Sequence, residues 1–222
     1  MNLSVDRGLT PARRTSGSID AMKAAYYSGN IFLGKIDIPI LDVRHYNDPD
    51  IDMHHSFASF EARLRMQQAQ GHADNQVIWM SKKPHEPRPM TINAMDRWLS
   101  QIKQNPQKTV VENKPNDIQD SCFKDDGKLI AQGPHVWDGR WNNKQTGQCL
   151  KIYPNFMSSR HVAGAPPNGS VFKCHTQSIK KAIELGIYGD IDISPHLERL
   201  EKIFPEGVCD YSKGDLGRPA DI

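Results

Sequence analysis

The sequence contains no long hydrophobic run, and its positive and negative charges nearly balance. Only 37% of its 222 residues are hydrophobic, and no stretch approaches the roughly 20 apolar residues that a membrane-spanning helix requires. A formal net charge of +2 produces no field strong enough to attract nucleic acid or an anionic membrane surface. We therefore expect neither nucleic acid nor a membrane among the partners of this chain.

Cysteine is scarce and confined to the second half of the chain, at Cys122, Cys149, Cys174 and Cys209. None of the four forms a Cys-x-x-Cys pair, which argues against a zinc ribbon or a redox motif. An even number of cysteines in a region rich in turns fits two disulfides and an oxidising compartment. Three pairings exist, and we favour Cys122–Cys149 with Cys174–Cys209 because these close the shorter loops. Four unpaired buried thiols are the alternative.

The chain starts without a visible export signal. Residues 1–14 are polar and basic and lack the apolar segment of roughly 7–15 residues that a signal peptide needs. Disulfides indicate an exported protein, whereas these first residues contain no export signal. The two observations agree if the true N-terminus lies upstream. We therefore expect a secreted or periplasmic protein of which this chain is a C-terminal piece.

The regular pattern lies between residues 19 and 105. A short helix at 19–27, stopped by Gly29, precedes a strand at 36–45 with apolar residues on both faces, as in a buried parallel strand. A helix at 53–69 capped by Asp52, a strand at 75–80 and a helix capped by Thr91 follow. Alternating strands and helices at this spacing predict an α/β fold.

Each of the two longer helices has an apolar stripe that should face the sheet. The first stripe comprises Met53, Phe57, Phe60 and Leu64. The polar residues expected on its other side are Glu61, Arg63, Arg65 and Gln68. The second stripe comprises Ile92, Met95, Leu99 and Ile102.

We divide the chain into three regions. Residues 1–18 form a loose N-terminal arm, and residues 19–105 form the C-terminal half of an α/β-hydrolase-like core with a partial sheet. Residues 106–222 form an irregular, disulfide-stapled, loop-rich region, in which short helices are expected at 178–185 and from Ser194 onward.

The candidate catalytic residues follow the two strands. In α/β-hydrolases a carboxylate and then a histidine follow successive strands, in the chain order Ser, Asp, His. Asp48 and His85 occupy these places, although Asp50 and Asp52 compete with Asp48, and a turn aspartate before proline is common. His54 and His55 are alternative bases. No Gly-x-Ser-x-Gly occurs, so the serine nucleophile is missing.

The segment Asp48–His55 also invites a metal interpretation, because alternating carboxylates followed by two histidines offer oxygen and nitrogen ligands. The calcium-loop motif fails, since Met53 or His55 stands where glycine is required. A zinc site built from His54, His55 and a carboxylate is the weaker alternative, and our main expectation is a chain without metal or cofactor.

Several blocks together resemble the C-terminal half of a tannase-like hydrolase-fold family of unknown function. The blocks are Asp52-Met53-His54, Ala73-Asp74-Asn75-Gln76-Val77-Ile78-Trp79, Val162-Ala163-Gly164-Ala165-Pro166, Phe172-Lys173-Cys174 and, most specific, Ile203-Phe204-Pro205-Glu206-Gly207-Val208-Cys209-Asp210-Tyr211-Ser212-Lys213. The resemblance implies a bacterial, secreted protein of ester-hydrolase ancestry. It also implies that a missing N-terminal portion carries the nucleophile and the oxyanion hole.

Two functions from different classes follow. The first is the C-terminal portion of a secreted ester hydrolase acting on an ester that the sequence does not identify. The second is a non-catalytic accessory or binding module. An exposed sheet edge would then favour self-association or docking of the missing N-terminal portion.

Overall fold

The computed structural model describes residues 17–50 and 53–222, and their contacts form two compact units. The sheet unit comprises residues 32–156, and the terminal unit joins the described residues up to 31 with residues 157–222. The three regions proposed from the sequence, with boundaries after residues 18 and 105, stay a prediction.

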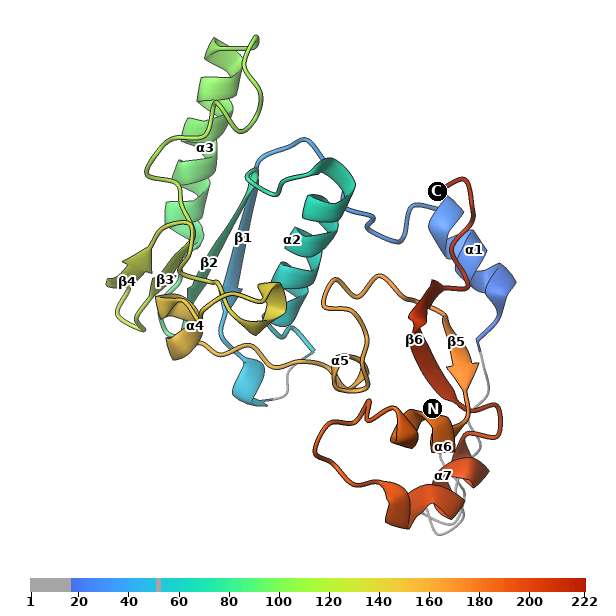
Figure 1. Cartoon of the computed structure of the whole chain (residues 1–222). Helices are drawn as coiled ribbons and strands as arrows, with labels where there is room; N and C mark the ends of the chain where they lie inside the picture. Colours follow the sequence, from blue (N-terminus) through green and yellow to red (C-terminus); the bar gives the residue numbers. More distant parts are fainter. Residues whose placement is uncertain (1–16, 51–52) are drawn as a thin grey trace. The chain divides into compact units, whose positions relative to one another are not determined.

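A four-stranded mixed sheet forms the centre of the sheet unit (Figure 1). Its strands, in spatial order, are β1 (Ile40–His45), β2 (Gln76–Ser81), β3 (Ser121–Phe123) and β4 (Leu129–Gln132). β1 and β3 both pair with β2 in parallel, and β4 runs antiparallel to β3. The mixed α/β architecture predicted from the sequence is confirmed.

β1 lies at the edge of the sheet, and this position corrects the expectation that it is buried on both sides. All six of its residues are half-buried, whereas all six residues of β2 are buried. The strand also starts at Ile40 rather than Ile36. The residue before it is Pro39, whose missing N–H cannot contribute to a strand ladder.

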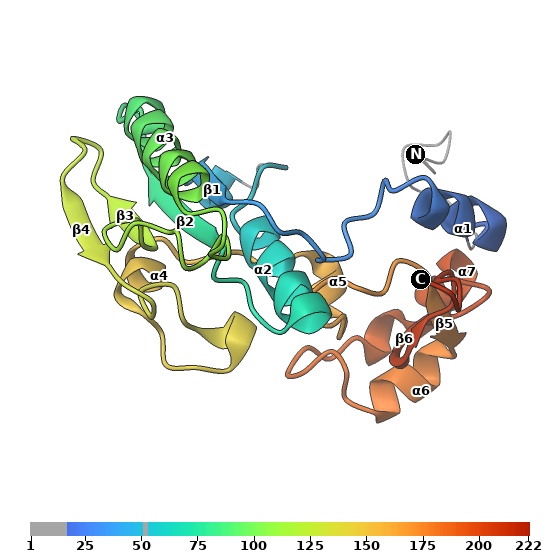
Figure 2. The ribbon, with the colours of Figure 1, turned by 90° about the horizontal axis from the view of Figure 1, so that it is seen from above.

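Helices α2 (Phe57–Gln70) and α3 (Arg88–Gln104) cover opposite faces of β1 and β2 (Figures 1 and 2). α2 begins after Ser56, later than expected, and ends at Gly71, whose φ of 83° suits glycine. The predicted cap, Asp52, lies outside the described residues. α3 begins three residues before Thr91 and accommodates Pro89 in its first turn.

The face that α3 presents to the sheet differs from the predicted stripe. Ala94 and Trp98 are buried in a core cluster with residues of β2 and β3. Ile92 and Leu99, which were expected there, are 68% and 50% exposed. The prediction was wrong for these two residues, whereas Ile102 of the same stripe does pack against the cluster. Periodicity alone does not reveal that Ala94 and Trp98, rather than Ile92 and Leu99, face the sheet.

Arg63 of α2 was expected on the solvent side and is buried instead. Its guanidinium donates two hydrogen bonds to the Asp120 carboxylate, at 2.6 and 2.9 Å, and one at 3.1 Å to Gln76 Oε1. Burial alone would lower the pKa of Arg63, but the neighbouring Asp120 carboxylate raises it. A buried arginine is tolerated because its donors meet a bidentate carboxylate.

The terminal unit is built around a two-stranded antiparallel sheet, β5 (Cys174–Gln177) and β6 (Val208–Asp215). Its helices are α1 (Ile19–Tyr27), α5 (Ser159–Val162), α6 (Ile179–Glu184) and α7 (Leu197–Ile203). α1 and α6 match their predicted positions, and Ser18 and Ser178 cap them through side-chain hydrogen bonds. The helix expected from Ser194 starts with a 3-10 turn, and α7 proper begins at Leu197.

Each unit contains one disulfide. Cys122–Cys149 joins β3 to the short helix α4 (Gln148–Ile152) in the sheet unit, and Cys174–Cys209 joins β5 to β6 in the terminal unit. Both predicted pairings are therefore confirmed. Within the described part of the chain, every helix is too short or too polar to cross a membrane.

Candidate active site at the carboxyl ends of β1 and β2

The candidate site lies where the parallel strands β1 and β2 end. His45 and Ser81, the last residues of the two strands, are direct neighbours in the register. The loops that follow them therefore start side by side. Ligands of open α/β sheets characteristically bind at this carboxyl edge.

Asp48 lies in the first of these loops and is buried, with 1% of its surface exposed. Its carboxylate accepts hydrogen bonds from Ser56 N at 2.8 Å, Ser56 Oγ at 3.0 Å and Phe156 N at 3.0 Å. Both oxygens are thus engaged, and none of these donors is a histidine. In this arrangement Asp48 ties the loop after β1 to the start of α2 and to residue 156.

The predicted histidines His54, His55 and His85 lie in the same two loops. None of the three hydrogen bonds to Asp48 described above comes from one of them. The His85 ring packs against Phe123, with 5.9 Å between ring centroids, and its Nε2 is buried with no hydrogen-bond partner among the described residues. The Nδ1 of His55 is likewise buried and has no such partner among them. His54 lies in an exposed turn before α2.

At this edge of the sheet, His45, which the sequence analysis did not select, lies close to a carboxylate. Its Nε2 lies 2.9 Å from the backbone oxygen of His85 and 3.5 Å from Oε1 of Glu86. Because both oxygens act as acceptors, Nε2 carries the proton and Nδ1 keeps the free lone pair. The missed signal was the position of His45 as the last residue of a parallel strand.

Glu86 is held in its ionised form by its surroundings. Arg88 Nε donates a hydrogen bond of 2.7 Å to Glu86 Oε2. This bond lowers the pKa of Glu86 below its ordinary value, and the charges of Arg88, His45 and Lys83 act in the same direction. A carboxylate that stays ionised orients a histidine and stabilises the imidazolium that forms when the histidine takes a proton.

A cavity of about 400 Å³ adjoins this pair. Its walls consist of Val43, Arg44, His45, Lys83, Glu86, Pro87 and Arg88. Arg44 is paired with Asp42, and Arg88 with Glu86, whereas Lys83 forms no ion pair with another described residue. The cavity thus combines a candidate general base with a cation suited to a developing negative charge.

Comparison with protein families matches residues 3–220 to a tannase-like family of unknown function. The chain belongs to this family. No curated protein and no solved structure matches it. The family assignment predicted from the sequence blocks is therefore confirmed over nearly the whole length of this tannase-like chain.

Two tyrosines pack together beside the loop that follows β1. The Tyr46 hydroxyl donates a 2.7 Å hydrogen bond to Pro154 O, and the Tyr46 and Tyr153 rings lie 5.0 Å apart. Burial, followed by the charge of Asp48, raises the pKa of Tyr46 to about 12. Tyr46 therefore remains a neutral hydrogen-bond donor and takes no part in proton transfer near neutral pH.

The alternative metal interpretation concerned the segment Asp48–His55. In the part of the chain that the structure describes, no three histidine, cysteine, aspartate or glutamate side chains gather as metal ligands. Asp52, one member of the suggested set, lies outside that part.

Proposed function

We propose that this chain carries the acid–base machinery of a secreted carboxylic-ester hydrolase, with His45 as general base and Glu86 as its orienting carboxylate. The observation that carries the proposal is the pair of acceptors at His45 Nε2, which leaves Nδ1 as the basic nitrogen. Membership of a tannase-like family supports the reaction class, and the two disulfides support an oxidising compartment.

The proposed chemistry begins with a water molecule attacking the ester carbonyl. His45 Nδ1 removes a proton from this water as the carbon–oxygen bond forms, and the Glu86 carboxylate stabilises the resulting imidazolium. The oxyanion of the tetrahedral intermediate lies within reach of the Lys83 ammonium. When the intermediate collapses, the ester oxygen leaves as an alcohol after taking the proton back from His45.

Because the sequence contains no nucleophile elbow, the chain by itself is expected to form no acyl-enzyme. A fluorophosphonate that labels reactive serines should therefore leave it unlabelled. If an N-terminal portion bearing a serine completes the site, the same base would act on that serine hydroxyl.

The competing assignment keeps Asp48 as the acid, with His85, or else His54 or His55, as the base. It requires the loop after β2 to rearrange, because His85 Nε2 is buried against the protein interior. It also requires the Asp48 carboxylate to exchange one of its three hydrogen bonds for a histidine.

The test is the rate of hydrolysis of 4-nitrophenyl butyrate by the purified chain. Loss of a general base typically costs about 10²-fold or more in rate, which is the effect expected for His45→Gln. Glu86→Gln should cause a smaller loss. His135→Gln is the matched control, because His135 also contacts a carboxylate, Asp138, at 3.0 Å but lies outside this cavity.

Each outcome of this assay decides between the candidate functions. A wild-type rate equal to that of buffer would exclude hydrolysis by this chain and leave the accessory or binding module. A rate that depends on His85 but not on His45 would transfer the base to His85. The accessory module is favoured by a different observation, a large apolar cavity in the terminal unit.

A further inference from the structure

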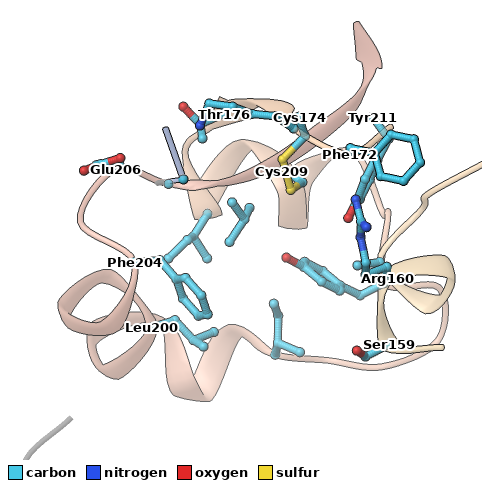
Figure 3. Close-up of a pocket in the computed structure, with 18 residues that line it drawn as sticks. Ser159, Arg160, Phe172, Cys174, Thr176, Leu200, Phe204, Glu206, Cys209 and Tyr211 are labelled. Carbon is cyan, nitrogen blue, oxygen red and sulfur yellow. A yellow bond between two sulfur atoms is a disulfide. The ribbon is translucent and has the colours of Figure 1, made fainter. Parts of the chain in front are cut away.

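The terminal unit contains a cavity of about 610 Å³ between its two-stranded sheet and helix α7 (Figure 3). Its walls are mainly apolar and include Ile179, Leu200, Phe204, Val208 and the Cys174–Cys209 disulfide. This volume lies within the roughly 300–1,000 Å³ typical of sites for small organic ligands. The walls come from segments far apart in the chain, and the disulfide fixes two of them.

Three charged residues line this cavity, Arg160, Lys173 and Glu206. In Figure 3, Arg160 extends beside Phe172 and Tyr211, and Glu206 lies across the cavity from it. One guanidinium nitrogen of Arg160 donates a hydrogen bond to the backbone oxygen of Val171. No carboxylate lies within ion-pair distance of Arg160 among residues 17–50 and 53–222. Its remaining donors are therefore available to an anion from outside the chain.

Tyr188 adds a hydroxyl group to the cavity wall. Burial, and to a lesser degree Tyr211, raises the pKa of Tyr188 above its ordinary value. The hydroxyl therefore stays protonated and can donate a hydrogen bond to an anionic ligand.

We propose that this cavity binds an apolar monocarboxylate, with the carboxylate on Arg160 and the hydrocarbon part against Leu200 and Phe204. Arginine presents several N–H donors in a fixed plane, which matches the two oxygens of a carboxylate. The apolar walls remove the hydrocarbon part of the ligand from water, which favours binding. This site lies in the other unit from His45 and does not rest on the proposed hydrolase activity.

The test is isothermal titration calorimetry of the full chain with 2-naphthoate and with its neutral counterpart, 2-naphthylmethanol. Both probes carry the same ring system and differ in the anionic group. Because a hydrogen bond to a charged group is worth more than a neutral one, the acid should bind about tenfold more tightly than the alcohol. Arg160→Gln should remove this difference and leave the affinity for the alcohol unchanged.

Arg199→Gln is the matched control for charge, because Arg199 is an exposed arginine of α7 that does not line the cavity. It should leave both affinities unchanged. Equal affinities of the wild-type chain for the acid and the alcohol would overturn the carboxylate assignment. Acid binding that survives Arg160→Gln would overturn the role of Arg160.

A second variant tests the cavity itself. Leu200→Trp fills space beside Phe204 and should abolish binding of both probes, whereas Leu185→Trp, at a 60% exposed position outside the cavity, should not. Far-UV circular dichroism verifies that each variant is folded. No binding by the folded wild-type chain, or undiminished binding by folded Leu200→Trp, would overturn the proposal. His45→Gln should leave naphthoate binding unchanged, so this proposal and the hydrolase proposal fail separately.

Discussion

The two units of this chain reach stability in different ways. The largest fully buried side chains, among them Trp98, Trp137, Phe57 and Phe60, all belong to the sheet unit. In the terminal unit the buried hydrophobic residues are fewer and mostly smaller, and Leu185 and Ile191 are about 60% exposed. Yet each unit has one disulfide.

The difference indicates that the sheet unit depends mainly on its core and the terminal unit on its cross-link. A small apolar core contributes little stability beyond the conformational entropy lost on folding. A disulfide reduces the entropy of the unfolded chain whatever the size of the core. The same sparse packing leaves the terminal unit an interior space of about 610 Å³.

The largest expected effect concerns the polar centre of the sheet unit. Arg63→Met leaves the Asp120 carboxylate buried without its partner, which typically destabilises a protein by about 3–5 kcal/mol. Urea unfolding followed by tryptophan fluorescence measures this loss. Arg97→Met is the control, because its ion pair with Asp117 is exposed and should contribute less than about 1 kcal/mol. Similar losses in the two variants would contradict the structural role of the buried pair.

The next effect concerns the cross-link of the terminal unit. Cys174 and Cys209 are 35 residues apart, and replacing both with alanine should cost about 4 kcal/mol in the chain-entropy model. We expect this unit to unfold separately, while the sheet unit keeps its transition. Differential scanning calorimetry reports whether a second, lower transition appears.

The matched variant removes the disulfide of the sheet unit, whose cysteines are 27 residues apart. Its expected entropic cost is similar, about 3.5 kcal/mol, but the core should keep the unit folded near room temperature. If the sheet unit were instead the one to unfold first, the contrast between core and cross-link would be wrong.

A smaller effect should depend on pH in the terminal unit. The Tyr26 hydroxyl donates a hydrogen bond to the Asp215 carboxylate. Although burial acts in the opposite direction, this bond and several backbone N–H groups lower the pKa of Asp215 below its ordinary value of 3.8. The ionised Asp215 carboxylate therefore stabilises the folded state at pH values above 3.8. This stabilisation is lost as the pH falls through the lowered pKa of Asp215 in the folded state.

Tyr26→Phe should accordingly destabilise the terminal unit by about 1 kcal/mol at pH 6 and by less at pH 2.5. Thermal melts of the two proteins at both pH values measure the difference. A difference that increases on acidification would have the wrong sign for this explanation.

The smallest effect tests the corrected orientation of α3. Leu99 is half-exposed, so Leu99→Ser should change the free energy of unfolding by no more than about 0.5 kcal/mol. Trp98→Ala removes a fully buried ring and should cost about 3–5 kcal/mol. A large loss of stability in Leu99→Ser would indicate that Leu99 faces the sheet, as the sequence predicted.

Much of the local structure could be predicted from sequence, because its causes act within one or two turns of chain. Ser18 and Ser178 cap their helices by accepting hydrogen bonds from N–H groups three residues ahead. Gly71 ends α2 because the left-handed conformation there suits glycine. Loop length was also sufficient to select both disulfide pairings.

The candidate site was predicted only in part. The sequence predicted the two strands whose following loops form the candidate site, because alternation of strands and helices is visible in the sequence. The role of Asp48 was harder to foresee, because one of its donors, Phe156 N, is 108 residues away. The contact between His45 and Glu86 depends on the register of β1 against β2, which places the loop after β2 next to the last residue of β1.

The sequence by itself therefore determined the positions of α1 and α6, the end of α2 at Gly71, which cysteines pair and to which family the chain belongs. Tertiary structure decided which face of α3 is buried, why Arg63 is inside and which histidine lies near a carboxylate at the candidate site. The physical reason is the range of the interactions. Caps, turns and loop closure depend on neighbours in the chain, whereas the burial of Arg63 depends on Asp120, which lies 57 residues away and reaches it only in the folded sheet.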